Sequence, residues 1–416
     1  MKKRIIFHID ANSAYLSWEA VWRLQHGYCI DLREIPSAVG GDPKTRHGII
    51  LAKSIPSREY GITTGESLYS AKQKCPHLYI APPNYSLYMK CSDGMVSLLN
   101  RYSSLVQRYS VDECFLDYTD SEPLFGDALS TAAIIKDKIK SELGFTVNIG
   151  VAHNKLLAKM ASELQKPDQL HTLFPGEIET KMWTLPVEEL FMVGRRTLPK
   201  LKKIGIDTIG DLARSDPIHI KSYLKSYGLL IWNYANGIDN SVVIQEDVLQ
   251  KGVGNSTTLH YDVTNVKEAH MVLLSLTEMV CMRLREKEAL AGVVSISIKN
   301  FGFSTYSHQY KMLSPIDCTN TIFDHVKRLF DEVWKGDPIR HMGVRLTELC
   351  SNKFYQTSIF DMQRSERYRK MDKAMDVIRK RYGKTSLIRS VFLHSGLKPI
   401  IGGVGEDEYP MMASIL

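Results

Sequence analysis

The stretch YSVDECFLDY, residues 109–118, places two acids, Asp112 and Glu113, side by side in an apolar run. Apolar and polar residues alternate along it, which predicts a β-strand. Neighbouring side chains of a straight strand point to opposite faces of the sheet. Both acids can serve one site only if the backbone turns or bulges around Ser110 to Glu113, and we expect such a turn.

A third acid completes a candidate metal site. The stretch RIIFHID, residues 4–10, predicts a buried strand that ends at Asp10 and leads into a helix over residues 12–24, with Asn12 and Ser13 as candidate N-caps. Carboxylates at the ends of neighbouring strands repel one another without cations between them. Two Mg²⁺ ions would relieve the repulsion and organise a nucleoside triphosphate for attack by a hydroxyl. An Asp-Glu pair alone is more often a feature of a sheet edge, and Asp10 favours the metal site.

Composition indicates a globular protein of two to four domains. The chain has 416 residues, of which 44% are hydrophobic and 24% charged. The basic start is too short for a signal peptide and no apolar run has transmembrane length, so we expect a cytoplasmic protein. Seven cysteines without a CxxC pair indicate reduced thiols rather than a disulfide framework or a zinc site.

Further elements continue the α/β pattern up to residue 167. They are a turn-rich stretch over 30–80, a helix over 84–108, a helix over 126–143, a strand over 145–152 and a helix over 154–165. With the strands over 4–10 and 109–118, these elements predict one α/β unit.

Residues 185–213, LPVEELFMVGRRTLPKLKKIGIDTIGDLA, resemble a helix-hairpin-helix. Backbone N–H groups at Gly194 could meet a phosphate without reading bases. The cations around it are Arg195, Arg196, Lys200, Lys202 and Lys203. A small helical bundle with a solvated basic face is the alternative for this segment.

Residues 253–349 predict a second α/β unit with the order β-α-β-β-α-β. Its second helix, over 319–335, carries apolar side chains at helical spacing, which predicts packing against a four-stranded sheet. These side chains are Ile322, Phe323, Val326, Leu329, Phe330, Val333 and Trp334. The sequence after this second unit predicts a linker and a basic helical stretch, RSERYRKMDKAMDVIRKRYG, residues 364–383.

Three motifs resemble those of the Y-family, or translesion, DNA polymerases. FHIDANSAY (7–15) resembles the first metal motif, YSVDECFLD (109–117) the second, and NIGVAHNKLLAKMASELQKP (148–167) the helix and Lys-Pro that close the palm. The motifs occur in the family's order and spacing, and the similarity covers nearly the whole chain. A bacterial enzyme of the polymerase IV type or the polymerase V catalytic-subunit type is therefore expected, which copies past damaged bases with low processivity and no proofreading.

The resemblance implies an α+β, multidomain right-hand fold. The expected parts are a palm with a mixed sheet (1–10 and 78–167), small fingers (11–77), a helix-hairpin-helix thumb (168–240), a β-α-β-β-α-β little finger (246–352) and a C-terminal tail with a clamp-binding motif (353–416).

The resemblance also implies a role for each matching residue. The metal-binding and catalytic carboxylates are Asp10, Asp112 and Glu113, with the Ala11 carbonyl as a further ligand. The nucleotide-binding residues are Asn12, Ser13, Ala14, Tyr15, Arg58 and Lys166. The DNA-binding residues of the thumb are Gly194, Arg195, Arg196, Lys200 and Lys203.

Two of these assignments have an alternative on the sequence alone. Tyr15 matches the steric gate, whose ring leaves no room for a 2′-hydroxyl, but it could equally be a core aromatic. Lys155, Lys159 and Lys166 share a helical face at steps of four and seven, and a solvated face is their alternative.

One position departs from the family pattern. Many members carry Tyr three residues before the fingers arginine, where this chain has Ile55. The missing hydroxyl contact occurs in the polymerase V-like branch, so the branch and the lesion preference stay open.

The tail and the charge distribution point to a partner. QTSIF, residues 356–360, resembles the bacterial sliding-clamp motif, in which Gln356, Ile359 and Phe360 would bind. A loop between a strand and a helix is the alternative. The net charge is +7, but residues 168–243 and 246–353 are each balanced, so we expect a weak, salt-sensitive grip on DNA.

The expected partners are primer-template DNA, deoxynucleoside triphosphates and the clamp, and the protein is expected to be a monomer that does not bind membranes. Two other classes of protein could use parts of this pattern. A two-metal nuclease or phosphohydrolase would use similar carboxylates but no steric gate, and an inactive, clamp-tethered DNA-binding protein would require a damaged triad.

Overall fold

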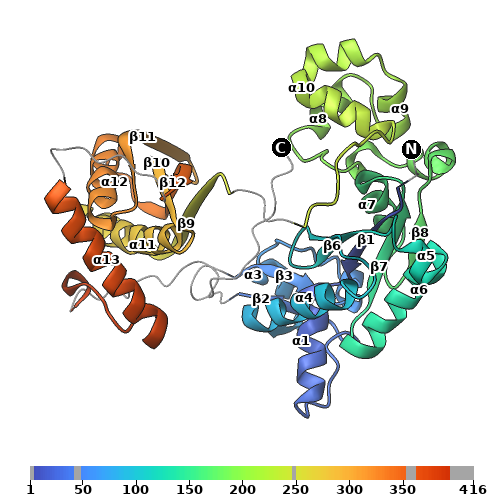
Figure 1. The fold of residues 1–416 in the computed structure, drawn as a ribbon, viewed down its shortest axis with the longest axis horizontal. Helices are drawn as coiled ribbons and strands as arrows, with labels where there is room; N and C mark the ends of the chain where they lie inside the picture. The colour runs from blue at the N-terminus through green and yellow to red at the C-terminus, as the bar shows by residue number, and fades with distance from the viewer. Residues whose placement is uncertain (1–3, 42–47, 246–249, 353–361, 394–416) are drawn as a thin grey trace.

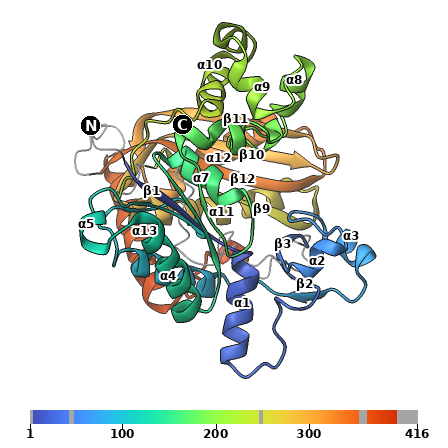
Figure 2. The ribbon, with the colours of Figure 1, turned by 90° about the vertical axis from the view of Figure 1, so that its right-hand side faces the viewer.

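The computed structural model describes residues 4–41, 48–245, 250–352 and 362–393. Figure 1 shows the elements after residue 250 as a body of their own, beside a larger body made by the earlier elements. Figure 2 shows the helices α8, α9 and α10 gathered at one end of the larger body and the strands β2 and β3 near the other. In the described ranges, no helix is both long enough and apolar enough to span a membrane.

A five-stranded sheet forms the centre of the larger body, in the order β5-β6-β1-β7-β8. Its strands are β1 (Ile6–Ala11), β5 (Val106–Arg108), β6 (Glu113–Asp117), β7 (Val147–Ala152) and β8 (Leu170–Thr172). β1 pairs with β6 and β7 in antiparallel fashion, whereas β7 and β8 are parallel. The sheet is therefore mixed.

Both faces of this sheet are buried. On β1, Phe7 and Ile9 join the core beneath α4 (Tyr85–Leu99) and α6 (Ala128–Lys138), whereas Ile6 joins the core beneath α7 (Lys155–Glu163). This division follows from the alternation of side chains along a strand. His8 and Asp10 therefore share the α7 side with Ile6.

Two of the predicted element boundaries are wrong. The helix predicted over 84–108 ends at Leu99, and Val106–Arg108 instead form the edge strand β5, which pairs with β6. Polar residues and a turn over 100–105 interrupt the helical pattern. The strand predicted over 109–118 begins only at Glu113, because the backbone turns just before it.

The turn-rich segment after α1 (Ala14–Gln25) forms a small sheet of three strands, in the order β3-β2-β4. The elements of this segment are β2 (Ser37–Gly40), β3 (Ile50–Lys53), α2 (Pro56–Glu59), α3 (Leu68–Lys74) and β4 (Tyr79–Ala81). A separate small core, which includes Ile50, Leu68 and Cys75, holds them together.

Short helices follow the five-stranded sheet and share the core beneath α7. They include the 3-10 turn Val187–Glu189, α8 (Leu198–Lys203), α9 (Ile209–Arg214) and α10 (Pro217–Ala235), which is kinked at Lys225. Other short elements are α5 (Glu122–Phe125), the π-helical turns Ile139–Leu143 and Ile178–Met182, and the 3-10 turn Pro175–Glu177.

The second body has the predicted β-α-β-β-α-β order. Its elements are β9 (Gly252–Val263), α11 (Val266–Glu286), β10 (Ala289–Asn300), β11 (Thr305–Ile316), α12 (Thr319–Val333) and β12 (Ile339–Ser351). The sheet order is β11-β10-β12-β9, and every pairing is antiparallel. The predicted apolar stripe of α12 enters this core through Ile322, Val326, Leu329 and Phe330. A further helix, α13 (Met362–Tyr382), and the 3-10 turn Ser390–Phe392 follow.

The position of α7 depends on Gly150 in β7. A Cβ atom at this position would lie 1.9 Å from the Ala158 carbonyl oxygen and 2.5 Å from the Ser162 backbone nitrogen, both in α7. Only glycine permits so close an approach of a helix to a strand.

We therefore expect Gly150→Ala to push α7 away from the sheet and to destabilise the protein by roughly 3 kcal/mol. Urea unfolding followed by circular dichroism measures the effect. Gly94→Ala is the matched control: it lies within α4, where the nearest atom to a new Cβ is 3.6 Å away, and alanine favours the helix. Equal stability of the two variants would contradict the close-approach argument.

Candidate functional site

A tight turn brings the two adjacent acids to one end of the five-stranded sheet. The backbone N–H groups of Tyr109 and Ser110 both donate to the Glu113 carbonyl, at 2.9 and 3.1 Å. Asp112 lies in this turn, outside the strand alternation, and its carbonyl accepts from the Ala11 N–H at 3.0 Å. Glu113 is the first residue of β6 and pairs directly with Asp10 of β1. The turn expected around Ser110 to Glu113 is therefore present.

Each acid has its own polar partner. Lys166 donates to Asp10 through a short hydrogen bond, and Lys159 donates to both carboxylate oxygens of Glu113 at 2.7 Å. The Ser110 hydroxyl donates to Asp112 at 2.5 Å. This end of the sheet therefore holds three carboxylates but only two of the lysine ammonium groups that pair with them.

The lysines do not form a solvated helical face. α7 ends at Glu163, so Lys166 lies beyond the helix that was predicted to carry it, and it also pairs with Glu163 at 2.9 Å. Lys155 is buried and donates to the Gln107 side chain at 2.9 Å. Lys155 and Lys159 reach the strands of the sheet because α7 packs closely against β1 and β7.

The pKa values of the three acids indicate that the site has too little positive charge to neutralise them. Burial raises the pKa of Asp10 to about 7 although Lys166 opposes the rise, and burial also raises the pKa of Asp112. Burial would raise the pKa of Glu113 as well, but His8 and Lys159 outweigh it and lower the pKa to about 2. A divalent cation near Asp10 and Asp112 would favour their charged forms.

The donor set fits a hard divalent cation, since carboxylate and carbonyl oxygens are the ligands that Mg²⁺ prefers. In the arrangement seen here, no three His, Cys, Asp or Glu side chains among the described residues converge on one point. Lys159 and Lys166 instead occupy the carboxylate oxygens. Metal binding would thus require these two ammonium groups to move away from the acids.

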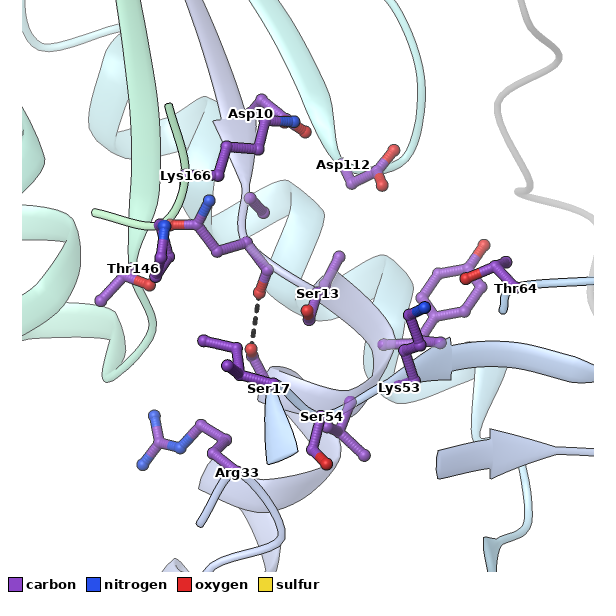
Figure 3. A pocket seen from close by; sticks show the side chains of 18 of the residues that line it. Asp10, Ser13, Ser17, Arg33, Lys53, Ser54, Thr64, Asp112, Thr146 and Lys166 are labelled. Atoms are coloured by element: carbon purple, nitrogen blue, oxygen red, sulfur yellow. Dashed lines mark hydrogen bonds and ion pairs between the residues drawn. The ribbon is translucent and has the colours of Figure 1, made fainter. Parts of the chain in front are cut away.

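The acids open into a cavity of about 500 Å³ between the five-stranded sheet and the small three-stranded sheet. Figure 3 shows Asp10, Asp112 and Lys166 on one side of this cavity and Lys53, Ser54 and Arg33 on the other. The structure brings together every metal- and nucleotide-binding residue named from the sequence: Asp10, Ala11, Asn12, Ser13, Ala14, Tyr15, Arg58, Asp112, Glu113 and Lys166 all line it. Ile55, the departure from the family pattern, lines it too.

The start of α1 forms part of the cavity wall. Ser13 is the N-cap, in a left-handed conformation with φ 48°, and within the described residues its side chain makes no capping hydrogen bond. The Asn12 side chain does not cap the helix, because it bonds Asn148 at 3.1 Å and the Asp168 N–H at 2.9 Å. Ser17 donates to the Asn12 carbonyl at 2.6 Å, the dashed line in Figure 3. The N–H groups of a helix start are suited to anionic ligands.

Tyr15 lies in an aromatic cluster at the edge of the cavity. Its ring stacks on Tyr88, with centroids 4.5 Å apart and planes 9° apart, and meets Tyr85 edge-on at 6.2 Å. The side chain is half-buried. It is thus packed on one side by the core and faces the cavity on the other, so both sequence interpretations describe part of its environment.

Several residues near the site were not named from the sequence. His8, fully buried, lies 3.6 Å from Glu113 through Nε2, and its Nδ1 bonds the Ser162 hydroxyl at 2.7 Å. Burial lowers the pKa of His8 to about 4. Its place two residues before Asp10 on a strand was a usable signal, since both side chains must share one face. Lys53, Thr64 and Thr146 carry no such signal, because only the tertiary fold brings them to the cavity.

The candidate DNA-binding residues of the thumb lie on the surface. Gly194, Arg195, Arg196, Lys200 and Lys203 are all exposed, around the turn that leads into α8. The Gly194 carbonyl accepts from the Thr197 and Leu198 N–H groups at 2.9 and 3.0 Å. The clamp-motif residues Gln356, Ile359 and Phe360 lie outside the described residues.

The chain is similar to known proteins over most of its length. It matches the impB/mucB/samB family over residues 9–163 and the C-terminal domain of that family over residues 250–359. It is similar to DNA polymerase IV of Clostridium acetobutylicum, at 46% identity over 94% of this chain and 98% of that protein. It is also similar to DNA polymerase IV 1 of Bacillus subtilis, at 37% identity over 93% and 92% of the two chains.

The solved structures show a likeness in fold. A Y-family DNA polymerase chimera superposes with a TM-score of 0.72 and 22% identity, over 84% of this chain and all of the chimera. The right-hand, multidomain α+β architecture is thereby confirmed. The chain belongs to the impB/mucB/samB family, which places it among the Y-family DNA polymerases.

Proposed function

We propose that this Y-family polymerase copies damaged DNA at the cavity between Asp10 and Arg58, by nucleotidyl transfer, with low processivity and no proofreading. One observation carries the proposal: the acids, the helix start, the aromatic Tyr15 and the cations Arg58 and Lys166 line a single cavity. A nuclease or phosphohydrolase would not need a cavity wall that can accommodate a triphosphate opposite its acids. The relatives are also named DNA polymerases.

Each part of the proposed right-hand fold has its own residue range and role. The palm is residues 1–10 and 78–167, the fingers 11–77, the thumb 168–240, the little finger 246–352 and the tail 353–416. Primer-template DNA would lie against the thumb through Gly194 and its neighbouring cations, whose contacts with phosphates position the duplex without reading sequence. Chromosomal DNA as the substrate implies a cytoplasmic protein.

Asp10, Asp112 and Glu113, with the Ala11 carbonyl, would hold two Mg²⁺ ions, which supply charge neutralisation and a more acidic primer hydroxyl when bound. Lys166 would then leave Asp10 and meet the triphosphate together with Arg58. The N–H groups from Ser13 to Tyr15 would bind the phosphate oxygens at the helix start. Lys159, which donates to both Glu113 carboxylate oxygens in the present arrangement, would likewise move away from its acid.

We expect Asp112→Asn and Glu113→Gln to lower primer extension by at least about 1,000-fold. Each variant removes a negative charge from the metal site, and several kcal/mol of transition-state stabilisation are lost with it. DNA binding should stay within about twofold of the parent protein. Single-turnover extension and fluorescence anisotropy measure the two effects. Glu163→Gln is the matched control, since Glu163 lines the same cavity but is 44% exposed, and its one ion pair among the described residues is with Lys166. Parental extension rates in either triad variant would refute the metal assignment.

Tyr15 would exclude ribonucleotides, because its ring is held in place by Tyr88 and cannot retreat from a 2′-hydroxyl. We expect Tyr15→Ala to raise the ratio of ribonucleotide to deoxynucleotide incorporation by about tenfold or more. Tyr69→Ala is the control, since Tyr69 is 75% exposed on α3 and does not line the cavity. The ratio is measured as kcat/KM for each sugar, and an unchanged ratio would place the gate elsewhere.

We also propose that QTSIF, residues 356–360, tethers the enzyme to a bacterial sliding clamp through Gln356, Ile359 and Phe360. A tether raises the effective concentration, near the DNA, of an enzyme that binds DNA weakly. Gln356→Ala with Phe360→Ala should remove the gain in product length from a loaded clamp while leaving single-nucleotide insertion intact. Thr357→Ala with Ser358→Ala is the control from the same segment. If clamp stimulation persists in the first variant, the segment is only a connection.

A further inference from the structure

The C-terminal helix α13 lies beside α12 and α11 of the second body (Figure 1). Charged side chains at steps of three, four and three residues along α13 make its polar contacts with this body. This spacing places them on one face of a helix. The four are Arg369, Asp372, Asp376 and Arg379. Two acids and two bases thus form the inward face of α13, and its own charges balance.

Each inward residue meets a partner of opposite charge or a backbone group. Arg285 donates to both oxygens of Asp376, at 2.6 and 3.0 Å, and lies 3.4 Å from Asp372, which also accepts from the Thr319 N–H at 2.8 Å. Arg369 donates to both oxygens of Asp317, at 2.6 and 3.1 Å.

At the other end of the inward face, Arg379 lies 3.3 Å from Glu278 and donates to the Leu387 carbonyl at 2.8 Å. Asp317, Asp372, Glu278 and Arg379 are all buried. Breaking buried pairs is costly, because it leaves an uncompensated charge. α13 is therefore held in one orientation, and its outer surface is a defined part of this body.

The outer surface of α13 is strongly basic. Its exposed cations are Arg367, Lys370, Lys373, Lys380 and Arg381, and its one exposed acid among residues 366–382 is Glu366. We call these five cations the basic face. None of the five forms an ion pair with any residue that the structure describes. At 100° per residue they span an arc of about 140° around the helix.

We propose that the basic face of α13 binds the phosphate backbone of DNA. The residues of the second body before α13, 246–353, balance thirteen bases against thirteen acids, so the unpaired charge of this body comes from the helix. The inward charges are neutralised in place, which directs the remaining cations to solvent. A band of unpaired Lys and Arg with no exposed acid but Glu366 matches a polyphosphate and carries no sequence information.

This surface is separate from the polymerase site. None of the five residues lines the cavity, and α13 packs on the helices of the second body, away from the acids of the palm. The basic face would add phosphate contacts to a thumb and a little finger that are each electrically balanced. It would therefore strengthen the grip on DNA without changing the chemistry.

The test measures DNA affinity against salt for the full chain. We expect the quadruple variant Lys370→Gln, Lys373→Gln, Lys380→Gln, Arg381→Gln to reduce the slope of log K against log[salt] by about 3.6, since each of the four phosphate contacts contributes about 0.9. Its Kd for a primer-template duplex at about 0.1 M salt should rise by about tenfold or more. Single-nucleotide insertion at saturating DNA should be unchanged, which also shows that the variant is folded.

Two further variants sharpen the test. Lys370→Arg with Lys373→Arg and Lys380→Arg keeps the charge and should keep the parental slope. Glu366→Lys extends the basic face and should increase the slope by about 1. An unchanged slope and Kd in the quadruple variant would overturn the proposal.

A membrane surface is the competing ligand for a basic helix. Vesicles of phosphatidylserine and phosphatidylcholine distinguish the two. If the parent protein sediments with these vesicles, the quadruple variant does not, and the DNA slope is the same for both, the basic face is a lipid-binding surface and the proposal is wrong. Loss of extension in the triad variants with an unchanged salt slope would separate this surface from the polymerase site.

Discussion

Burial of acids at one end of the palm sheet is the constraint on which the site depends. Asp10 and Glu113 face each other across β1 and β6, on the side covered by α7. Such charges are tolerated inside a protein only when they are paired or neutralised. Lys159 comes from α7 and Lys166 from the segment after it, so the helix that completes the core also supplies the compensating charge.

That arrangement depends in turn on a close contact of backbones. Gly150 lets α7 lie so near β7 that any side chain there would strike the helix. His8 and Ser162 then bond across the same interface, and Asn148 bonds the carbonyls of Ser162 and Gln165. The cavity is thus built on a rigid layer of sheet and helix, whereas its opposite wall belongs to the small sheet with a separate core.

The charged residues of the chain serve two different purposes in the two bodies. In the palm, an excess of acids over lysines creates a demand for cations, which suits a site for metal ions and a triphosphate. In the second body, acids and bases are paired against each other along the inward face of α13, and the exposed charges described on this helix are five cations and Glu366. The net charge of the chain alone does not distinguish these two arrangements from each other.

The sequence by itself determined the elements with strong local patterns: the buried strand ending at Asp10, the β-α-β-β-α-β order and the apolar stripe of α12. Local patterning decides these because side-chain periodicity matches the period of strand or helix. The motifs also identified the acids, Tyr15, Arg58 and Lys166 as residues of one site. The end of α4 at Leu99, the edge strand β5 and the pairing of Lys159 with Glu113 were decided by the tertiary structure. They depend on contacts between residues far apart in the chain, which no local pattern contains.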